Sequence, residues 1–169
     1  MQSRFLKHAV SLSVLSAAII SCTSETPNPV GIETVRLAVI ANADNGGKPF
    51  SLDMTQEVTS TPPYAGDADG TGTALLTVNH GQRTVCWELT VADVTLPATA
   101  AHIHKAAAGI RGGVVVFLSA PDATGHAAGC AGDLDRNLLR DILTNPAEYY
   151  VNVHTSDYPA GAVRAQMHH

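Results

Sequence analysis

The feature that most constrains the fold is a series of short runs rich in Val, Ile, Thr and Ala, most of them separated by segments that contain Gly, Pro or Asn. They fall at residues 35–41, 73–78, 84–91, 95–103, 114–118, 149–154 and 162–167. The turn sequence Asn79-His80-Gly81-Gln82 separates two of them and predicts a hairpin. Strands this short, with turns at this spacing, predict an all-β fold, an antiparallel sandwich or barrel.

One segment has the period of a helix instead. Residues 133–143 place Leu and Ile at helical spacing, and Asp133 or Asp135 could cap the N-terminus. Asn145-Pro146 is a stop signal. The sequence therefore predicts one short helix within the β fold.

The remaining segments are predicted to be loops or core. Residues 60–73 are rich in Pro, Gly, Asp and Thr, and residues 125–132 in Gly and Ala, so both are expected to be loops. Trp87 and Phe117 lie inside predicted strands and are assigned to the hydrophobic core.

The first 21 residues have the pattern of an export signal. Arg4 and Lys7 precede an apolar stretch too short to span a bilayer comfortably. Ile19-Ile20-Ser21-Cys22 resembles the bacterial lipobox, in which the cysteine becomes the lipidated N-terminus; the alternative is a plain secretory signal with an incidental cysteine. Thr23, rather than Asp, follows Cys22, so inner-membrane retention is not signalled.

These features predict an exported, lipid-anchored protein of the cell envelope, at the outer membrane. Residues 1–21 would be the signal peptide, residues 22–33 the lipidated end and tether, and residues 34–169 the folded domain. The membrane would be a partner through the anchor alone.

Cleavage of that signal changes the charge. The whole chain has a formal charge of −5, and removing Arg4 and Lys7 leaves eight basic against 15 acidic residues, a charge of −7. No basic stripe remains to neutralise phosphates, which argues against nucleic acid as a partner.

Cys86 and Cys130 are the only cysteines besides Cys22. In an exported chain an even pair suggests a structural disulfide. Cysteine ligation of a metal is the less favoured alternative, since neither residue has a second cysteine nearby.

The clearest chemical signal is Ala100-Ala101-His102-Ile103-His104. In a strand, His102 and His104 would stand on one face, where two neutral imidazoles can bind one transition-metal ion. His154 offers a third imidazole from another predicted strand. The alternative is two strands with solvent-facing histidines. Tyr149 and Tyr150 would point to opposite faces, one into the core and one beside the metal.

An ordered set of motifs resembles the chordin-type (CHRD) domain over about residues 34–167. The motifs are Gln56-Glu57-Val58, Gly70-Thr71-Gly72-Thr73-Ala74, Ala101-His102-Ile103-His104, Gly112-Gly113-Val114-Val115-Val116, the segment 145–155 and the segment 158–166. The resemblance implies an extracellular all-β module. It implies no activity.

A looser resemblance is to copper/zinc superoxide dismutases, which are Greek-key antiparallel β-sandwiches with a His-x-His strand. It implies that His102, His104 and His154 are copper ligands, that His126 is the loop ligand, and that Arg164 guides an anion to the metal. A zinc-binding cluster of histidines plus Asp is missing from the sequence, and the cysteines sit differently. The alternative role for Arg164 is a salt bridge with Glu88 or Asp157, while Lys105 and Arg111 could add local positive potential.

The sequence therefore predicts a mononuclear copper site, with zinc less favoured, and superoxide as the small-molecule substrate. The alternative is a module without enzymatic activity, for copper storage or for adhesion. Hydrolysis at a zinc site is a more distant alternative, because no general base accompanies the histidines. No protein partner is indicated.

Overall fold

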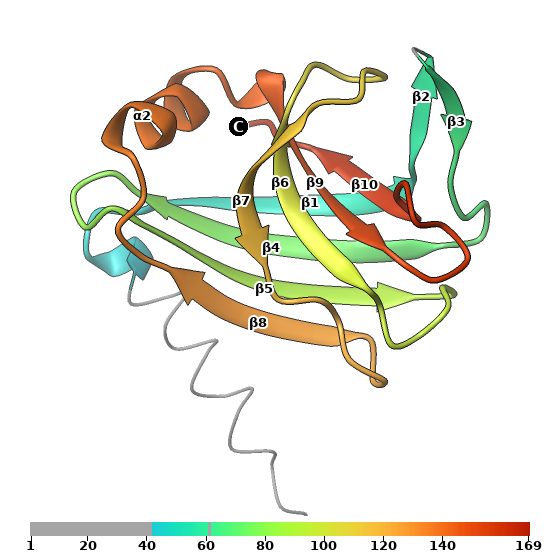
Figure 1. Cartoon of the computed structure of the whole chain (residues 1–169). Helices are drawn as coiled ribbons and strands as arrows, with labels where there is room; N and C mark the ends of the chain where they lie inside the picture. The colour runs from blue at the N-terminus through green and yellow to red at the C-terminus, as the bar shows by residue number, and fades with distance from the viewer. Residues whose placement is uncertain (1–41, 61) are drawn as a thin grey trace, which may run out of the picture.

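A computed structural model describes residues 42–60 and 62–169 and shows a mostly antiparallel β-sandwich (Figure 1). The strands are β1 Lys48–Gln56, β2 Val58–Ser60, β3 Pro63–Ala65, β4 Thr71–Asn79, β5 Thr84–Ala92, β6 Ala100–Lys105, β7 Gly113–Leu118, β8 His126–Ala131, β9 Tyr149–His154 and β10 Val163–Gln166. Helix α2 spans Arg136–Thr144, and the 3-10 turn η1 spans Pro146–Glu148. The predicted all-β class with one short helix is confirmed.

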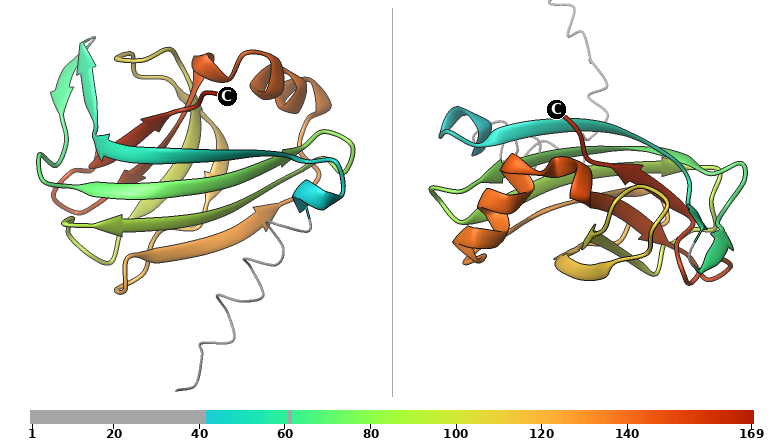
Figure 2. Two further views of the ribbon diagram at one scale, coloured as in Figure 1. Left: turned by 180° about the vertical axis from the view of Figure 1, so that it is seen from behind. Right: turned by 90° about the horizontal axis from the view of Figure 1, so that it is seen from above.

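Eight strands are hydrogen-bonded in the order β7-β6-β9-β10-β1-β4-β5-β8. Strand β1 pairs with β4 along most of its length and with β10 through Thr55 and Gln56 at its end. It therefore joins two four-stranded layers, β7-β6-β9-β10 and β1-β4-β5-β8, which lie across one another (Figures 1 and 2). The Greek-key connection stays a prediction.

The core lies between these layers, and side-chain alternation decides what faces it. In β6 and β9, the core residues are Ala101 and Ile103 and, from the other strand, Tyr149, Val151 and Val153. Since alternate side chains point to opposite faces, the intervening residues of both strands face outward. The predicted histidines are among them.

Helix α2 begins and ends where its sequence signals place it. The Asp135 side chain caps the N-terminus by accepting hydrogen bonds from the backbone amides of Asn137 and Leu138, and Asn145 is the C-cap. Leu139 and Ile142 are fully buried in the shared core.

The loop predicted at residues 125–132 is wrong, because His126–Ala131 forms β8 and pairs with β5. Its small residues suit close packing rather than a loop. A Cβ at Gly129 would lie 2.7 Å from Cζ2 of Trp87, so the absent side chain lets the indole lie against the strand. Gly and Ala have low β-propensity, so the sequence did not predict this strand, which is stabilised by packing.

The long loop predicted at residues 60–73 is also partly wrong. It contains strand β3, which pairs with β2 as a short hairpin, and the first residues of β4. Strand β1, absent from the sequence-based prediction, alternates buried and exposed residues over most of its length.

Of the two aromatic residues assigned to the core, Trp87 is buried and Phe117 is exposed. Trp87 is buried, and its Nε1 donates to Ser119 Oγ at 3.0 Å. Phe117 is 73% exposed, so its core assignment is wrong. It pairs with His102 in the β6–β7 register and so shares the outer face, while its neighbours Val116 and Leu118 turn inward.

The predicted disulfide is confirmed. Cys86 and Cys130 are joined, and they stand directly opposite each other in the β5–β8 pair. The disulfide therefore ties two neighbouring strands together rather than a strand to a loop.

The predictions for the signal peptide, Cys22, the tether and the strand at residues 35–41 all lie outside the described residues. Within the described ranges, no helix has the length and apolar character needed to cross a membrane.

Candidate metal centre

His102, His104 and His154 converge on the outer face of the β6–β9 pair. The register sets His154 opposite Ala100 and places Asn152 and Tyr150 opposite His102 and His104. One ring nitrogen of each histidine lies within 4.8 Å of the others. The ring centroids of His102 and His154 are 5.0 Å apart, although 51 residues separate the two in sequence. The expected convergence is therefore present.

Backbone carbonyls fix which nitrogen carries the proton in two of the rings. His104 Nδ1 donates to the Gly112 carbonyl at 3.0 Å, and His154 Nδ1 donates to the Pro159 carbonyl at 3.1 Å. A carbonyl oxygen only accepts, so Nε2 of both rings keeps its lone pair. His102 Nδ1 lies 3.2 Å from His154 Nε2. These two nitrogens therefore face each other.

The surroundings keep all three imidazoles neutral at neutral pH. Burial lowers the pKa of His102 to about 4, and repulsion from His154 and His104 adds to this effect. Burial also lowers the pKa of His104 and of His154, outweighing the carbonyls of Gly112 and Pro159, which raise them. Neutral imidazole is the form that binds a metal.

Tyr150 forms the wall of the site beside His104. The two rings stack with centroids 4.8 Å apart and planes 5° from parallel. Tyr149 lies in the core instead, so the prediction that the two tyrosines point to opposite faces is confirmed. The Tyr150 hydroxyl accepts a hydrogen bond from the Gly112 amide at 3.2 Å, which holds the same residue that orients His104.

Arg164 lies on the far side of the Tyr150 ring. Its Cζ is 3.3 Å from the ring centroid, and β10 borders β9 on the side away from β6. The guanidinium donates to the carbonyls of Ile110 and Ala107 at 2.8 and 3.0 Å, and to Gln166 Oε1. Tyr150 therefore separates the arginine from the histidines, and Arg164 holds the loop 106–112 in place.

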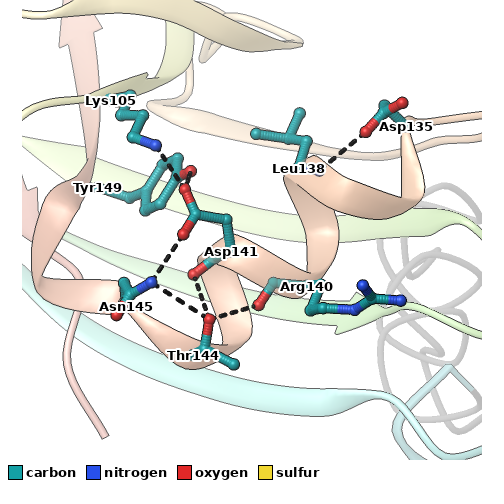
Figure 3. A network of polar contacts seen from close by, with 8 residues as sticks. All are labelled: Lys105, Asp135, Leu138, Arg140, Asp141, Thr144, Asn145 and Tyr149. Carbon is teal, nitrogen blue, oxygen red and sulfur yellow. Dashed lines mark hydrogen bonds and ion pairs between the residues drawn. The ribbon is translucent and has the colours of Figure 1, made fainter.

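The other predicted contributors are also elsewhere. His126 belongs to the opposite layer, on β8, where its Nε2 lies 3.5 Å from Thr90 Oγ1. It is not brought into the cluster. Lys105 pairs with Asp141 on α2 (Figure 3), and Arg111 lies over the Tyr64 ring.

Two buried polar residues next to the site were not among the predicted ones. Asn152 is 1% exposed and Glu57 is fully buried, and Asn152 Nδ2 donates to Glu57 Oε2 at 3.0 Å. Asn152 precedes His154 by two residues in a predicted strand, so the period of two could have placed it on the histidine face. Glu57 is 95 residues away from Asn152, and the motif Gln56-Glu57-Val58 that contains it gives no sign of this contact.

Comparison with known proteins gives one match. The family model described as the CHRD domain matches residues 49–167. No curated protein and no solved structure matches the chain significantly.

Proposed function

The chain belongs to the CHRD-domain family, and we propose that this member binds one copper ion through His102, His104 and His154. The observation that most supports this is His104 Nε2, which is buried and has no hydrogen-bond partner among the described residues. A buried acceptor left unpaired costs roughly 1–3 kcal/mol. A cation that receives the lone pairs of all three rings would remove that cost.

The donor set favours copper over zinc. Imidazole suits both metals, but Cu(II) stands at the top of the affinity order for nitrogen ligands among the divalent first-row metals. Thiolate ligands would favour Cu(I) or zinc, but Cys86 and Cys130 are bonded to each other in a disulfide. Three neutral imidazoles without a thiolate therefore support copper, with zinc as the competitor.

We place this copper site in the cell envelope, anchored to the outer membrane through Cys22. A structural disulfide supports an oxidising compartment, because such bonds persist chiefly outside the cytosol. The test is fractionation of Cys22→Ser, which we expect to be released from membranes or to accumulate as precursor. Unchanged membrane association would contradict the anchor.

Superoxide is the substrate that we propose for the bound metal. Copper supplies one-electron redox chemistry, through which two superoxide anions and two protons would give dioxygen and hydrogen peroxide. His102 and His154 are only partly buried, so a small anion can approach the cluster from solvent. Tyr150 closes the opposite side by stacking on His104.

Copper storage without turnover is the second candidate, and the position of Arg164 favours it. The guanidinium is behind Tyr150 and bound to carbonyls, and Lys105 is paired with Asp141. Neither cation is therefore placed to attract superoxide toward a protein of net negative charge. Turnover measurements must decide between the two candidates.

The deciding experiment uses the full chain with His168→Ala and His169→Ala, which remove adventitious imidazoles at the end. We expect one copper per chain by metal analysis, and faster superoxide loss by pulse radiolysis in the copper-loaded protein than in the metal-free protein. Failure to retain stoichiometric copper would overturn the metal site. Retention without faster superoxide loss would leave storage as the function.

A further inference from the structure

Beside the three histidines lies a buried pair formed by the Asn152 amide and the Glu57 carboxylate. Asn152 stands opposite His102 in the β6–β9 register, so its side chain is on the histidine face. Its Nδ2 donates to Glu57 Oε2 at 3.0 Å. Because a carboxylate oxygen accepts hydrogen bonds, this contact assigns the nitrogen end of the amide to Glu57. The oxygen, Oδ1, then points to the other side.

That oxygen is one of several polar atoms here without a partner. Asn152 Oδ1, His104 Nε2 and Glu57 Oε1 are all buried, and none of them has a hydrogen-bond partner in the described part of the chain. Asn152 follows Tyr150, the register partner of His104, by two residues, so its side chain lies on the face that carries His104. Asn152 Oδ1 and His104 Nε2 are therefore unpaired acceptors buried on the same face of the β6–β9 pair.

Two buried acceptors on the same face need a positively charged or hydrogen-donating partner. A proton on Nε2 could satisfy both, but Nδ1 of His104 already holds the proton against Gly112. A second proton would put a positive charge on a buried ring, which costs solvation energy. A metal ion satisfies the nitrogen and the oxygen together.

We propose that Asn152 Oδ1 is a fourth ligand of the ion held by His102, His104 and His154, and that Glu57 is the positioning residue that keeps this oxygen toward the ion. The inference rests on the proposed copper site and adds to it an oxygen ligand. An amide oxygen is a harder ligand than imidazole, so it favours Cu(II) over Cu(I).

Gly161 supports a built arrangement rather than an accidental one. A Cβ at this position would lie within 2 Å of Glu57 Oε2 and 3.2 Å from Asn152 Nδ2. Its backbone φ of +127° is also a conformation that other residues rarely adopt. The chain thus keeps a side chain out of the space where the carboxylate and the amide meet.

The test compares Cu(II) and Cu(I) affinities of the full chain by chelator competition, in the His168→Ala/His169→Ala background. Asn152→Leu, which is close in shape, should weaken Cu(II) binding about tenfold and leave Cu(I) binding within about twofold. A tenfold loss confined to Cu(II) raises the one-electron midpoint potential by about 59 mV. The electron paramagnetic resonance spectrum of bound Cu(II) should change as well.

Asn152→Leu leaves the buried Glu57 carboxylate without its partner and could destabilise the fold, so a second variant is needed to separate loss of the ligand from loss of folding. Glu57→Met/Asn152→Leu removes both polar groups and should show the same Cu(II) loss in a folded chain. Glu57→Gln keeps an acceptor for Asn152 and should retain most of the Cu(II) affinity, whereas Glu57→Met alone should not. This difference between Glu57→Gln and Glu57→Met is expected if Glu57 acts by holding the Asn152 amide in place.

The matched control is Asn79→Leu. Asn79 lies on β4 in the other layer, is equally buried, and donates to the carbonyls of Asn42 and Asn45. The substitution Asn79→Leu should lower stability without altering the Cu(II) or the Cu(I) affinity. Unchanged Cu(II) affinity and potential in folded Asn152→Leu or in the double variant would overturn the oxygen ligand. A parent chain that binds no copper would overturn the proposed function itself.

Discussion

Strands β6 and β9 present two polar clusters, on opposite faces of the same pair. Lys105 and Tyr149 are paired in register and meet Asp141 of α2, where both donate to the carboxylate together with Asn145 (Figure 3). The next pair, His104 and Tyr150, belongs to the histidine cluster. The two clusters are one residue apart along each strand.

What separates them is the balance of donors and acceptors. Around Asp141, three donors meet the two oxygens of one carboxylate, and the result joins α2 to the sheet. Around His104, two buried acceptors, His104 Nε2 and Asn152 Oδ1, have no hydrogen-bond partner among the described residues, whereas His102 and His154 share a hydrogen bond. A balanced cluster holds elements together, and the unpaired acceptors are the atoms that the proposed ion would satisfy. The following predictions test this distinction.

The largest effect is expected from His154→Ala. Loss of one ligand should weaken copper binding by more than about 100-fold, beyond the 10- to 100-fold typical of outer-shell changes. The metal-free protein should keep its thermal stability within about 0.5 kcal/mol, since the side chain is partly exposed. Competition titration and thermal denaturation measure the two quantities.

His126→Ala is the control for that variant, because His126 lies on β8 and contacts Thr90. Its copper affinity should equal that of the parent chain. If His126→Ala weakened binding as strongly as His154→Ala, the cluster of three would not be the site.

Arg164→Met should affect both stability and copper binding. The Ala107 and Ile110 carbonyls would lose charged donors, at a cost of about 1.5–3 kcal/mol. Because the loop they belong to presents Gly112 to His104, copper affinity should fall about tenfold. Urea denaturation and competition titration are the measurements.

The exposed Arg140 on α2 supplies the matched control, and Arg140→Met should change stability by less than about 0.5 kcal/mol. The role as an anion guide predicts a different result for Arg164→Met: slower superoxide loss with unchanged stability and copper affinity. That outcome would restore the sequence-based assignment.

Asp141→Asn should act on stability alone, and in a pH-dependent way. The hydrogen bond from Lys105, followed by those from Tyr149 and Asn145, holds the pKa of Asp141 well below its usual range. A lowered carboxyl pKa contributes stability that is complete above about pH 4 and is lost as the pH falls through the folded-state pKa.

Thermal melts between pH 2 and pH 6 measure this contribution. The wild-type melting temperature should fall more steeply below about pH 4 than that of Asp141→Asn, and the two proteins should bind copper equally. Weaker copper binding by Asp141→Asn would show that the two clusters are not independent.

The smallest effect is expected from Phe117→Ser. The ring is 73% exposed and meets His102 only edge-on, at 5.3 Å between centroids. Stability should change by less than about 0.5 kcal/mol, and copper affinity by less than about twofold. A loss of several kcal/mol, as for a buried aromatic, would contradict the outward position of this ring.

Periodicity predicted the parts of the fold where local pattern and packing agree. The alternation in residues 149–154 placed His154 on the outer face, and the leucine spacing around Asp135 predicted α2 with its cap. The alternation of side chains in each strand puts all three histidines on the outer face, and they converge because β6 and β9 are neighbours in the sheet.

Features that depend on distant contacts escaped prediction. Strand β8 pairs with β5, and its small residues fit against Trp87. A run of Gly and Ala gives no sign in the sequence that it packs against an indole ring. Phe117 faces outward because its register with His102 sets its direction, whereas hydrophobicity suggested the core. Glu57 reaches Asn152 across 95 residues, so only the folded chain reveals that they meet.

The disulfide divides the three proposed ligands topologically. Cys86 and Cys130 close a covalent ring that contains His102, His104 and the loop that orients them, whereas His154 is outside it. In the unfolded chain His102 and His104 stay close because they are two residues apart, and folding must bring in His154. In the proposed copper site, metal affinity would therefore be linked to folding, and a bound ion would favour the native ensemble over the denatured one. At a copper concentration 100 times the dissociation constant, this linkage stabilises the fold by about 2.7 kcal/mol.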